Sequence, residues 1–190
     1  MEKIINEILK HRLQEKNFFE IINNFENIIE KSKILNSPIK INEYFGKGIG
    51  KSTVITKLLN DKIIEKDWID IFTGDIKGLY IFFTNDNYPL YVGITKNIIN
   101  RIIQHIKGTT HNQATLAYNM GLINYRIDNN MEYTGTREKF DFIRYVKPMQ
   151  EYLINQKIGF LNVLNDDELY ILEIYCSMKY KTILNKFETH

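Results

Sequence analysis

The pattern of hydrophobic and polar positions changes near Asp75. Residues 1 to about 36 have the spacing of an amphipathic helix, interrupted near Asn17, and a Lys-rich helical segment follows them. After Asp75 the pattern becomes that of a strand. The change predicts a mainly helical N-terminal region over residues 1–75 and a second domain over residues 76–190.

Two short strings in the second domain lie on segments that predict neighbouring strands. Gly78-Leu79-Tyr80 and Tyr91-Val92-Gly93 are separated by the turn-forming residues Thr84 to Pro89, which predicts a β-hairpin. With a side-chain period of two, Tyr80 shares a face with Phe82, and Tyr91 shares one with Gly93. The glycine leaves room there for a backbone or a ligand.

Spacings of three and four predict helices after the hairpin. The first has an apolar face made of Ile98, Ile99, Ile102, Ile103 and Ile106, and it places Arg101 and His105 on another side. A helix that begins at Asp166 is expected to leave Glu173 beside a buried stripe of Leu169, Leu172, Tyr175 and Met178. Between these two, the sequence predicts a short helix from His111 to Gly121, a longer helix over residues 136–156 that Pro148 bends or restarts, and a late strand over residues 159–164.

Together these elements predict an α+β fold with a small antiparallel or mixed three-stranded sheet flanked by helices. The length of 190 residues and the hydrophobic content of 44% suffice for a real core. The lone Cys176 excludes a disulfide within the chain and a multi-cysteine zinc site. No apolar stretch is long enough to cross a membrane, so a cytoplasmic protein without a membrane partner is expected.

A net charge of +2 is only slightly basic, so a nucleic-acid surface would need local clustering of charge. Residues 31–66 supply such a cluster, with eight lysines against three acidic residues. A DNA contact and a solvated lysine face both remain open for this stretch. His111 and His190 are interpreted as polar surface.

The same stretch contains Gly46-Lys47-Gly48-Ile49-Gly50-Lys51-Ser52-Thr53, which invites comparison with a phosphate-binding P-loop. Phe45 stands where the P-loop needs its first glycine, and no aspartate follows an apolar strand to hold magnesium, so no bound nucleotide is expected. Three interpretations stay open: half of a helix-hairpin-helix, a small helix-turn-helix with residues 52–60 as its recognition helix, and an ordinary glycine turn.

The two hairpin strings resemble the signature of the GIY-YIG nuclease family, with Leu79 and Val92 in place of the middle isoleucines. The resemblance implies that an arginine on the first helix, here Arg101, contacts the scissile phosphate and that His105 stands one turn later. It also implies that Glu173 binds the metal ion and that Asn185 helps to order the site. The order of the later elements and the ending from Asn185 to His190 resemble bacterial stand-alone members.

The resemblance therefore implies a metal-dependent DNA endonuclease, with Tyr80 as the general base and Tyr91 or His105 assisting. A single carboxylate is a sufficient anchor for Mg²⁺ or Mn²⁺, because Mg²⁺ keeps most of its waters. An ordinary phenol has a pKa of about 10, so Arg101 and a metal-bound water are expected to favour the phenolate, with His105 accepting its proton. The alternative is an inactive module of the same fold that only binds nucleic acid. Double-stranded DNA is the expected partner, and the oligomeric state, a dimer included, stays open.

Overall fold

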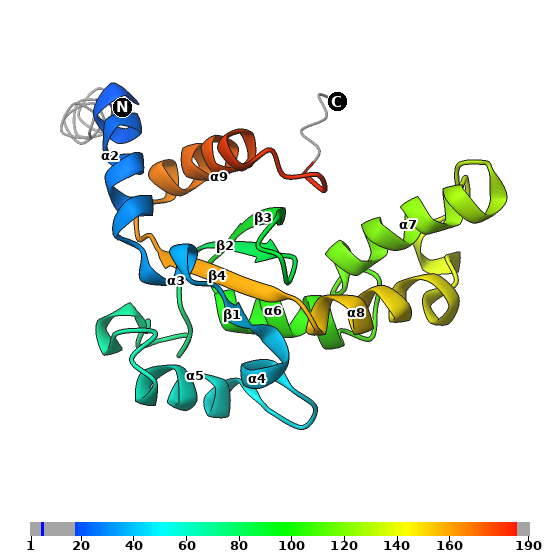
Figure 1. Ribbon diagram of the computed structural model, residues 1–190, viewed down its shortest axis with the longest axis horizontal. Coiled ribbons are helices and arrows are strands. Elements are labelled where there is room, and N and C mark those ends of the chain that lie inside the picture. Colours follow the sequence, from blue (N-terminus) through cyan, green and yellow to red (C-terminus); the bar gives the residue numbers. More distant parts are fainter. Residues whose placement is uncertain (1–4, 6–17, 186–190) are drawn as a thin grey trace. The chain divides into compact units, whose positions relative to one another are not determined.

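The computed structural model describes residue 5 and residues 18–185, and these divide into two compact units between Ser32 and Lys33 (Figure 1). In the first unit, α2 (Phe18–Lys31) places Ile21, Phe25 and Ile29 four residues apart on one face. The predicted helix before Asn17 and the residue His190 lie outside the described residues. No helix in the described part of the chain has the length and apolar character needed to span a bilayer.

The second unit is built around a four-stranded antiparallel sheet in the order β1-β4-β2-β3. The strands are β1 (Ile39–Lys40), β2 (Gly78–Phe83), β3 (Pro89–Thr95) and β4 (Lys157–Asn162). The predicted α+β fold, the hairpin and the late strand are confirmed. The fourth strand, β1, was not predicted, because two residues are too few to produce an alternating pattern.

The register of the hairpin brings Tyr80 of the first signature string and Tyr91 of the second onto one face of the sheet. Tyr80 pairs with Gly93, and Phe82 pairs with Tyr91. Directly opposed residues in an antiparallel pair project to the same side of the sheet. The two faces predicted separately for Tyr80 and Tyr91 are therefore a single face.

Helices cover both sides of this sheet. Figure 1 shows α6 (Ile98–Lys107) on one side and α9 (Asp166–Tyr180) on the other. Asn165 caps α9, because its side chain accepts a hydrogen bond from Glu168 N. The predicted buried stripe of α9 is partly wrong: Leu169 and Leu172 are buried, but Met178 is 72% exposed and Cys176 takes the inner position.

Residues 33–60 belong to the same compact unit as the sheet. They form α3 (Lys33–Asn36), β1, α4 (Ile41–Phe45) and α5 (Lys51–Asn60), and a single 3-10 turn follows at Lys66–Trp68. The side chains that they add to the central core are Ile34, Ile41, Phe45, Val54 and Leu58. The predicted domain boundary near residue 75 stays a prediction, whereas the compact units divide between Ser32 and Lys33.

The segment between α6 and β4 differs from its predicted helices. The short helix predicted from His111 is α7 (Thr115–Asn129), which starts later and runs further. The long helix predicted over 136–156 is a 3-10 turn (Arg137–Lys139), a π turn (Phe142–Val146) and α8 (Lys147–Ile154). Pro148 lies in the first turn of α8, where its missing N–H costs no helical hydrogen bond.

Candidate active site

Tyr80 lies in the middle of β2 with its side chain almost completely buried. Its phenol oxygen is 2.9 Å from Nε2 of His105 on α6. Burial raises the pKa of Tyr80 well above its ordinary value, and the nearby charge of Arg101 opposes that rise only in part. In the free chain this phenol is therefore protonated at neutral pH.

Gly93 is the residue that makes room for the Tyr80 ring. A Cβ atom at Gly93 would lie 2.4 Å from the Tyr80 hydroxyl oxygen and 2.5 Å from its Cζ. Such distances are far below van der Waals contact. The space predicted for a backbone or ligand is thus filled by the phenol itself, and the glycine fixes where that phenol can stand.

His105 is fully buried, whereas the spacing of α6 predicted a position on its polar side. The reason is that α6 packs against helices as well as the sheet: its neighbours include α5, α7 and α8. Nδ1 of His105 accepts a hydrogen bond of 3.3 Å from Leu116 N, so the remaining proton of the neutral ring is on Nε2. His105 therefore donates to the Tyr80 oxygen, and burial followed by the charge of Arg101 lowers its pKa well below the usual range.

Tyr91 lies beside Tyr80, with ring centroids 6.2 Å apart, and is 6.1 Å from the His105 ring. Burial raises the pKa of Tyr91, the Glu173 carboxylate raises it further, and the Arg101 guanidinium lowers it. Opposite charges from two helices thus act on the same phenol. Because β3 is the edge strand of the sheet, groups from both sides of the sheet can meet there.

Arg101 is held in place from its own helix and from the following loop. Its Nη1 donates to Gln104 Oε1 at 3.1 Å and to the Gln113 carbonyl at 3.3 Å. These contacts occupy one guanidinium nitrogen and leave further donors of the fork for an anion. Gln104 and Gln113 were not predicted, although the spacing of three between Arg101 and Gln104 was a visible signal.

Glu173 projects from the flank of α9, and burial alone raises the pKa of its carboxyl group. No cation compensates its charge among the described residues, and no cluster of three or more His, Cys, Asp or Glu side chains is found in that part of the chain. A half-buried, uncompensated carboxylate fits a hard divalent cation that keeps most of its waters. Within residues 18–185 the site is thus consistent with the predicted ion, with Glu173 as its carboxylate ligand.

Asn185 contacts β3 rather than the tyrosines. Its Oδ1 accepts from Val92 N and its Nδ2 donates to Val92 O, both at 2.8 Å. Thr182 Oγ1 also donates to Oδ1, and Leu184 N donates to Leu90 O. The side chain therefore pairs with the strand between Tyr91 and Gly93 as another strand would.

The glycine-rich loop of residues 46–50 is bound to the helix that carries Arg101 and His105. Lys107 Nζ, at the end of α6, donates to the carbonyls of Gly46 and Ile49. Lys51 Nζ donates to Thr73 O and is 3.9 Å from a carboxylate oxygen of Asp75. Lys51, the lysine of the P-loop-like string, thus has its ammonium group bound to other residues of the protein.

Asp75 is a further residue at this site that was not predicted from the sequence. Its buried carboxylate accepts hydrogen bonds from Ile99 N at 2.9 Å and Asn100 N at 3.1 Å and so caps the N-terminus of α6. An ordinary cap precedes its helix directly. Asp75 stands more than twenty residues earlier, so no local spacing could have revealed it.

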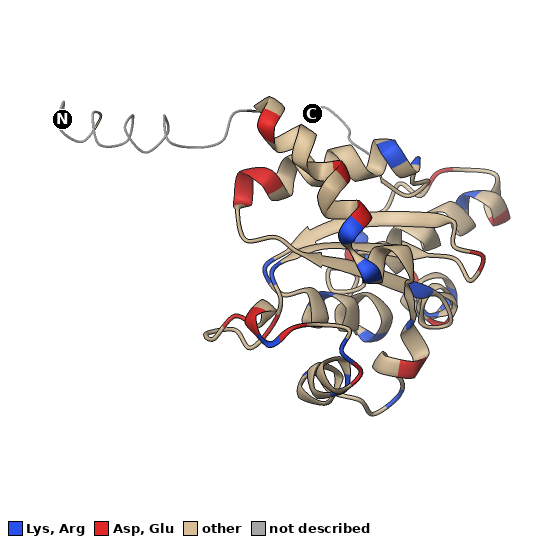
Figure 2. Cartoon of the chain, turned by 60° about the vertical axis from the view of Figure 1, so that its left-hand side comes forward, with Lys and Arg blue, Asp and Glu red and all other residues tan. Residues whose placement is uncertain are grey.

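Several lysines of residues 31–66 bind other groups of the protein with their ammonium groups. Lys40 is 3.4 Å from Glu43, and Lys57 donates to the Glu43 carbonyl, in addition to the contacts of Lys51. In the view of Figure 2, basic residues are interspersed with acidic ones. A DNA contact by residues 31–66 stays a prediction. His111, predicted at the surface, is half-buried and has Nε2 2.8 Å from Phe140 O.

Comparison with known families bears on the same segment. Residues 76–152 match the model of the GIY-YIG catalytic domain. The matched segment contains Tyr80, Tyr91, Arg101 and His105, while Glu173 and Asn185 lie beyond its end. No curated protein and no solved structure matches the chain. The signature strings, the register that unites them and the family match agree, and the chain therefore contains a GIY-YIG catalytic domain.

Proposed function

We propose that this chain is a metal-dependent endonuclease that hydrolyses phosphodiester bonds in double-stranded DNA. The observation that carries the proposal is the pair of neighbouring phenols on the hairpin, Tyr80 and Tyr91, with ring centroids 6.2 Å apart. The charges of Glu173 on α9 and Arg101 on α6 both act on Tyr91. Phosphodiester hydrolysis requires a base for the attacking water and positive charge beside the phosphoryl oxygens. The two phenols would supply the base, and Arg101 together with a metal ion on Glu173 would supply the charge.

Each side chain has a distinct role in this proposal. Arg101 binds the scissile phosphate, because its guanidinium cannot lose its charge and matches phosphate geometry. Tyr80 takes the proton of the attacking water, and Tyr91 orients that water or the phosphate. Mg²⁺ or Mn²⁺ held by Glu173 would neutralise charge on the phosphoryl and leaving oxygens.

His105 acts as a positioning residue for Tyr80. Its Nε2–H donates to the phenol oxygen, and that donor would favour the phenolate over the phenol. The proton of Tyr80 therefore leaves towards solvent or substrate and not to His105. This differs from the predicted role of His105 as the acceptor of that proton.

Plasmid nicking tests the function. Supercoiled DNA is incubated with the wild type, Tyr80→Phe and Glu173→Gln, each with Mg²⁺, with Mn²⁺ and with EDTA. We expect both variants to lose at least about 100-fold in cleavage rate and EDTA to abolish cleavage by the wild type. Glu151→Gln, an exposed carboxylate on α8, is the matched control and should cleave normally. Full activity of Glu173→Gln would refute the metal assignment.

The second candidate is a module that binds DNA without cutting it. It is favoured by the raised pKa of the buried Tyr80, which is unfavourable for a general base. A gel shift by the wild type, with no nicked product in Mg²⁺ or Mn²⁺ at any pH up to about 9, would support it over the nuclease.

A further inference from the structure

A tight turn directly before β2 exposes two large apolar side chains. Ile69 and Ile76 form an isolated antiparallel bridge at its base, and Asp70 Oδ1 accepts from Phe72 N at 3.1 Å and Thr73 N at 2.7 Å. Ile71 is 87% exposed and Phe72 90% exposed at the tip. The turn is hydrogen-bonded on the inside, yet its tip offers only hydrocarbon to solvent.

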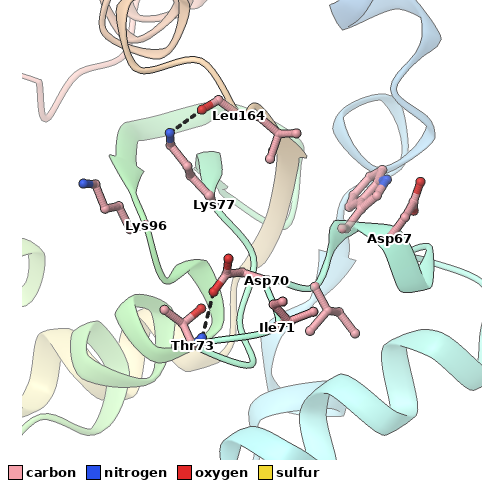
Figure 3. Close-up of a pocket in the computed structure, with 9 residues that line it drawn as sticks. Asp67, Asp70, Ile71, Thr73, Lys77, Lys96 and Leu164 are labelled. Atoms are coloured by element: carbon pink, nitrogen blue, oxygen red, sulfur yellow. Dashed lines mark hydrogen bonds between the residues drawn. The ribbon is translucent and has the colours of Figure 1, made fainter.

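A cavity of about 360 Å³ lies beside this turn (Figure 3). Trp68, Ile71 and Leu164 give it apolar walls. Its charged lining residues are two aspartates and two lysines, so their formal charges cancel. A neutral cavity with an aromatic wall suits a planar, uncharged group rather than a phosphate.

Lys77 and Lys96 differ in the number of polar contacts that their ammonium groups make with the protein. Lys77 donates to the Leu164 carbonyl and is 3.1 Å from the Asp166 carboxylate, and Figure 3 shows the first of these contacts. Lys96 is exposed and makes no hydrogen bond or ion pair with any residue that the structure describes. Its ammonium group at the rim of the cavity is thus available for an anion outside it.

The cavity lies at the end of the hairpin where β2 begins and β3 ends. Lys77 is three residues before Tyr80, and Lys96 is three residues after Gly93. At about 3.3 Å per residue, three strand residues span about 10 Å. Lys77 directly precedes β2 and Lys96 directly follows β3, so both lysines mark the same end of the hairpin.

We propose that Ile71 and Phe72 form a wedge that enters a base step of the DNA substrate and that the adjacent cavity receives the unstacked base. Apolar side chains inserted between base pairs unstack and kink the duplex. The base then stacks on Trp68, and Lys96 pairs with the phosphate outside. The inference rests on the proposed function, because it places the substrate duplex across the hairpin.

Fluorescence of 2-aminopurine tests the wedge. Duplexes with this base at successive positions on either side of the mapped cut are bound to the full chain in EDTA. We expect a severalfold rise in fluorescence at one position near the cut. Phe72→Ala should remove most of that rise without changing the melting temperature, since Phe72 makes no buried contact. Tyr88→Ala is the control: Tyr88 is an aromatic residue, 71% exposed, at the other end of the hairpin.

Lys96→Ala gives a second readout. It should lower the slope of log affinity against log salt by about 1, because one phosphate contact is lost. Lys47→Ala, an exposed lysine outside the cavity, should leave the slope unchanged.

The outcomes separate the wedge from the nuclease. If the wild type cleaves DNA but fluorescence rises at no position, the wedge is wrong and the function stands. If Phe72→Ala retains the full rise, or instead converts an oligomer to a monomer in gel filtration, the turn is not a DNA wedge. If the wild type neither binds nor cleaves duplex DNA, both proposals are wrong.

Discussion

Tyr80 and Gly93 face each other on the two strands of the hairpin, and the Tyr80 ring fills the space that a side chain at position 93 would need. The Tyr80 phenol lies where a side chain at Gly93 would stand, and it is fixed there by the donor of His105. The family signature thus has a packing cause as well as a chemical one: the glycine is needed so that the tyrosine can lie across the neighbouring strand.

Gly93→Ala is expected to displace the phenol. The added methyl would overlap the Tyr80 ring and destabilise the fold by about 1–3 kcal/mol. We expect urea denaturation to show this loss and plasmid nicking to fall towards the level of Tyr80→Phe. Gly50→Ala is the control, since its Cβ would meet nothing within 4 Å. Normal cleavage by Gly93→Ala would mean that the position of the phenol is unimportant.

Glu173 is expected to cost stability at neutral pH. Burial raises its pKa in the folded state, so its contribution to stability is present below the pKa of the unfolded chain and is lost as pH rises through the folded value. Glu173→Gln should therefore melt about 1–3 °C above the wild type near pH 7, and the gap should close near pH 4. Calorimetry in metal-free buffer measures this. A lower melting temperature for the variant would mean that the carboxylate has a stabilising partner.

Both ends of α6 bind residues that precede the matched family segment. Asp75 caps its first turn, while Lys107 at its last turn holds the glycine-rich loop. The helix that carries Arg101 and His105 therefore depends on residues 46–51 and on Asp75 for its position. The string that resembles a P-loop is a structural support for α6.

The substitution Asp75→Ala should lower the free energy of unfolding more than a substitution of Lys51, whose ammonium lies 3.9 Å from the Asp75 carboxylate. Asp75→Ala leaves the buried amide of Ile99 and the partly buried amide of Asn100 without their acceptor, which costs about 1–3 kcal/mol. Lys51→Met removes one partly exposed partner and should cost about 1 kcal/mol. The free energy of unfolding in urea measures both, with Lys47→Met as the control. Equal losses for Asp75→Ala and Lys47→Met would show that the cap is unimportant.

Local spacing was enough to predict the hairpin, α6 and the start of α9, because each is formed by residues close in sequence. It failed where distant segments decide the outcome. His105 is buried because α7 and α8 cover a side of α6 that looks polar in isolation. A local signal was also overlooked: the helix predicted over 136–156 becomes α-helical only at Lys147, because Asp141 accepts from Arg144 N and starts a π turn over Phe142–Val146 before it.

At the scale of the whole molecule, the segment that matches the family model shares its core with residues that precede it. Residues 33–60 add a strand to the sheet and place Ile41, Phe45, Val54 and Leu58 in its core. The family match begins only at residue 76. The segment before the match is therefore part of the same folding unit.

Truncation tests this dependence. A chain of residues 33–190 should melt cooperatively, whereas residues 76–190 should not, because several fully buried side chains would lose their partners. Circular dichroism during heating and limited proteolysis distinguish the two outcomes. A cooperative transition for residues 76–190 would support the predicted boundary near residue 75.

The pairing of Asn185 with Val92 has a consequence for solubility. An open sheet edge recruits strands from other copies of a protein, and β3 would be such an edge. The amide of Asn185 satisfies the outward N–H and C=O of Val92, and Leu184 occupies the carbonyl of Leu90. At the opposite edge, β1 is only two residues long. Fewer backbone groups are thereby left for a further strand at either border, which disfavours aggregation edge to edge.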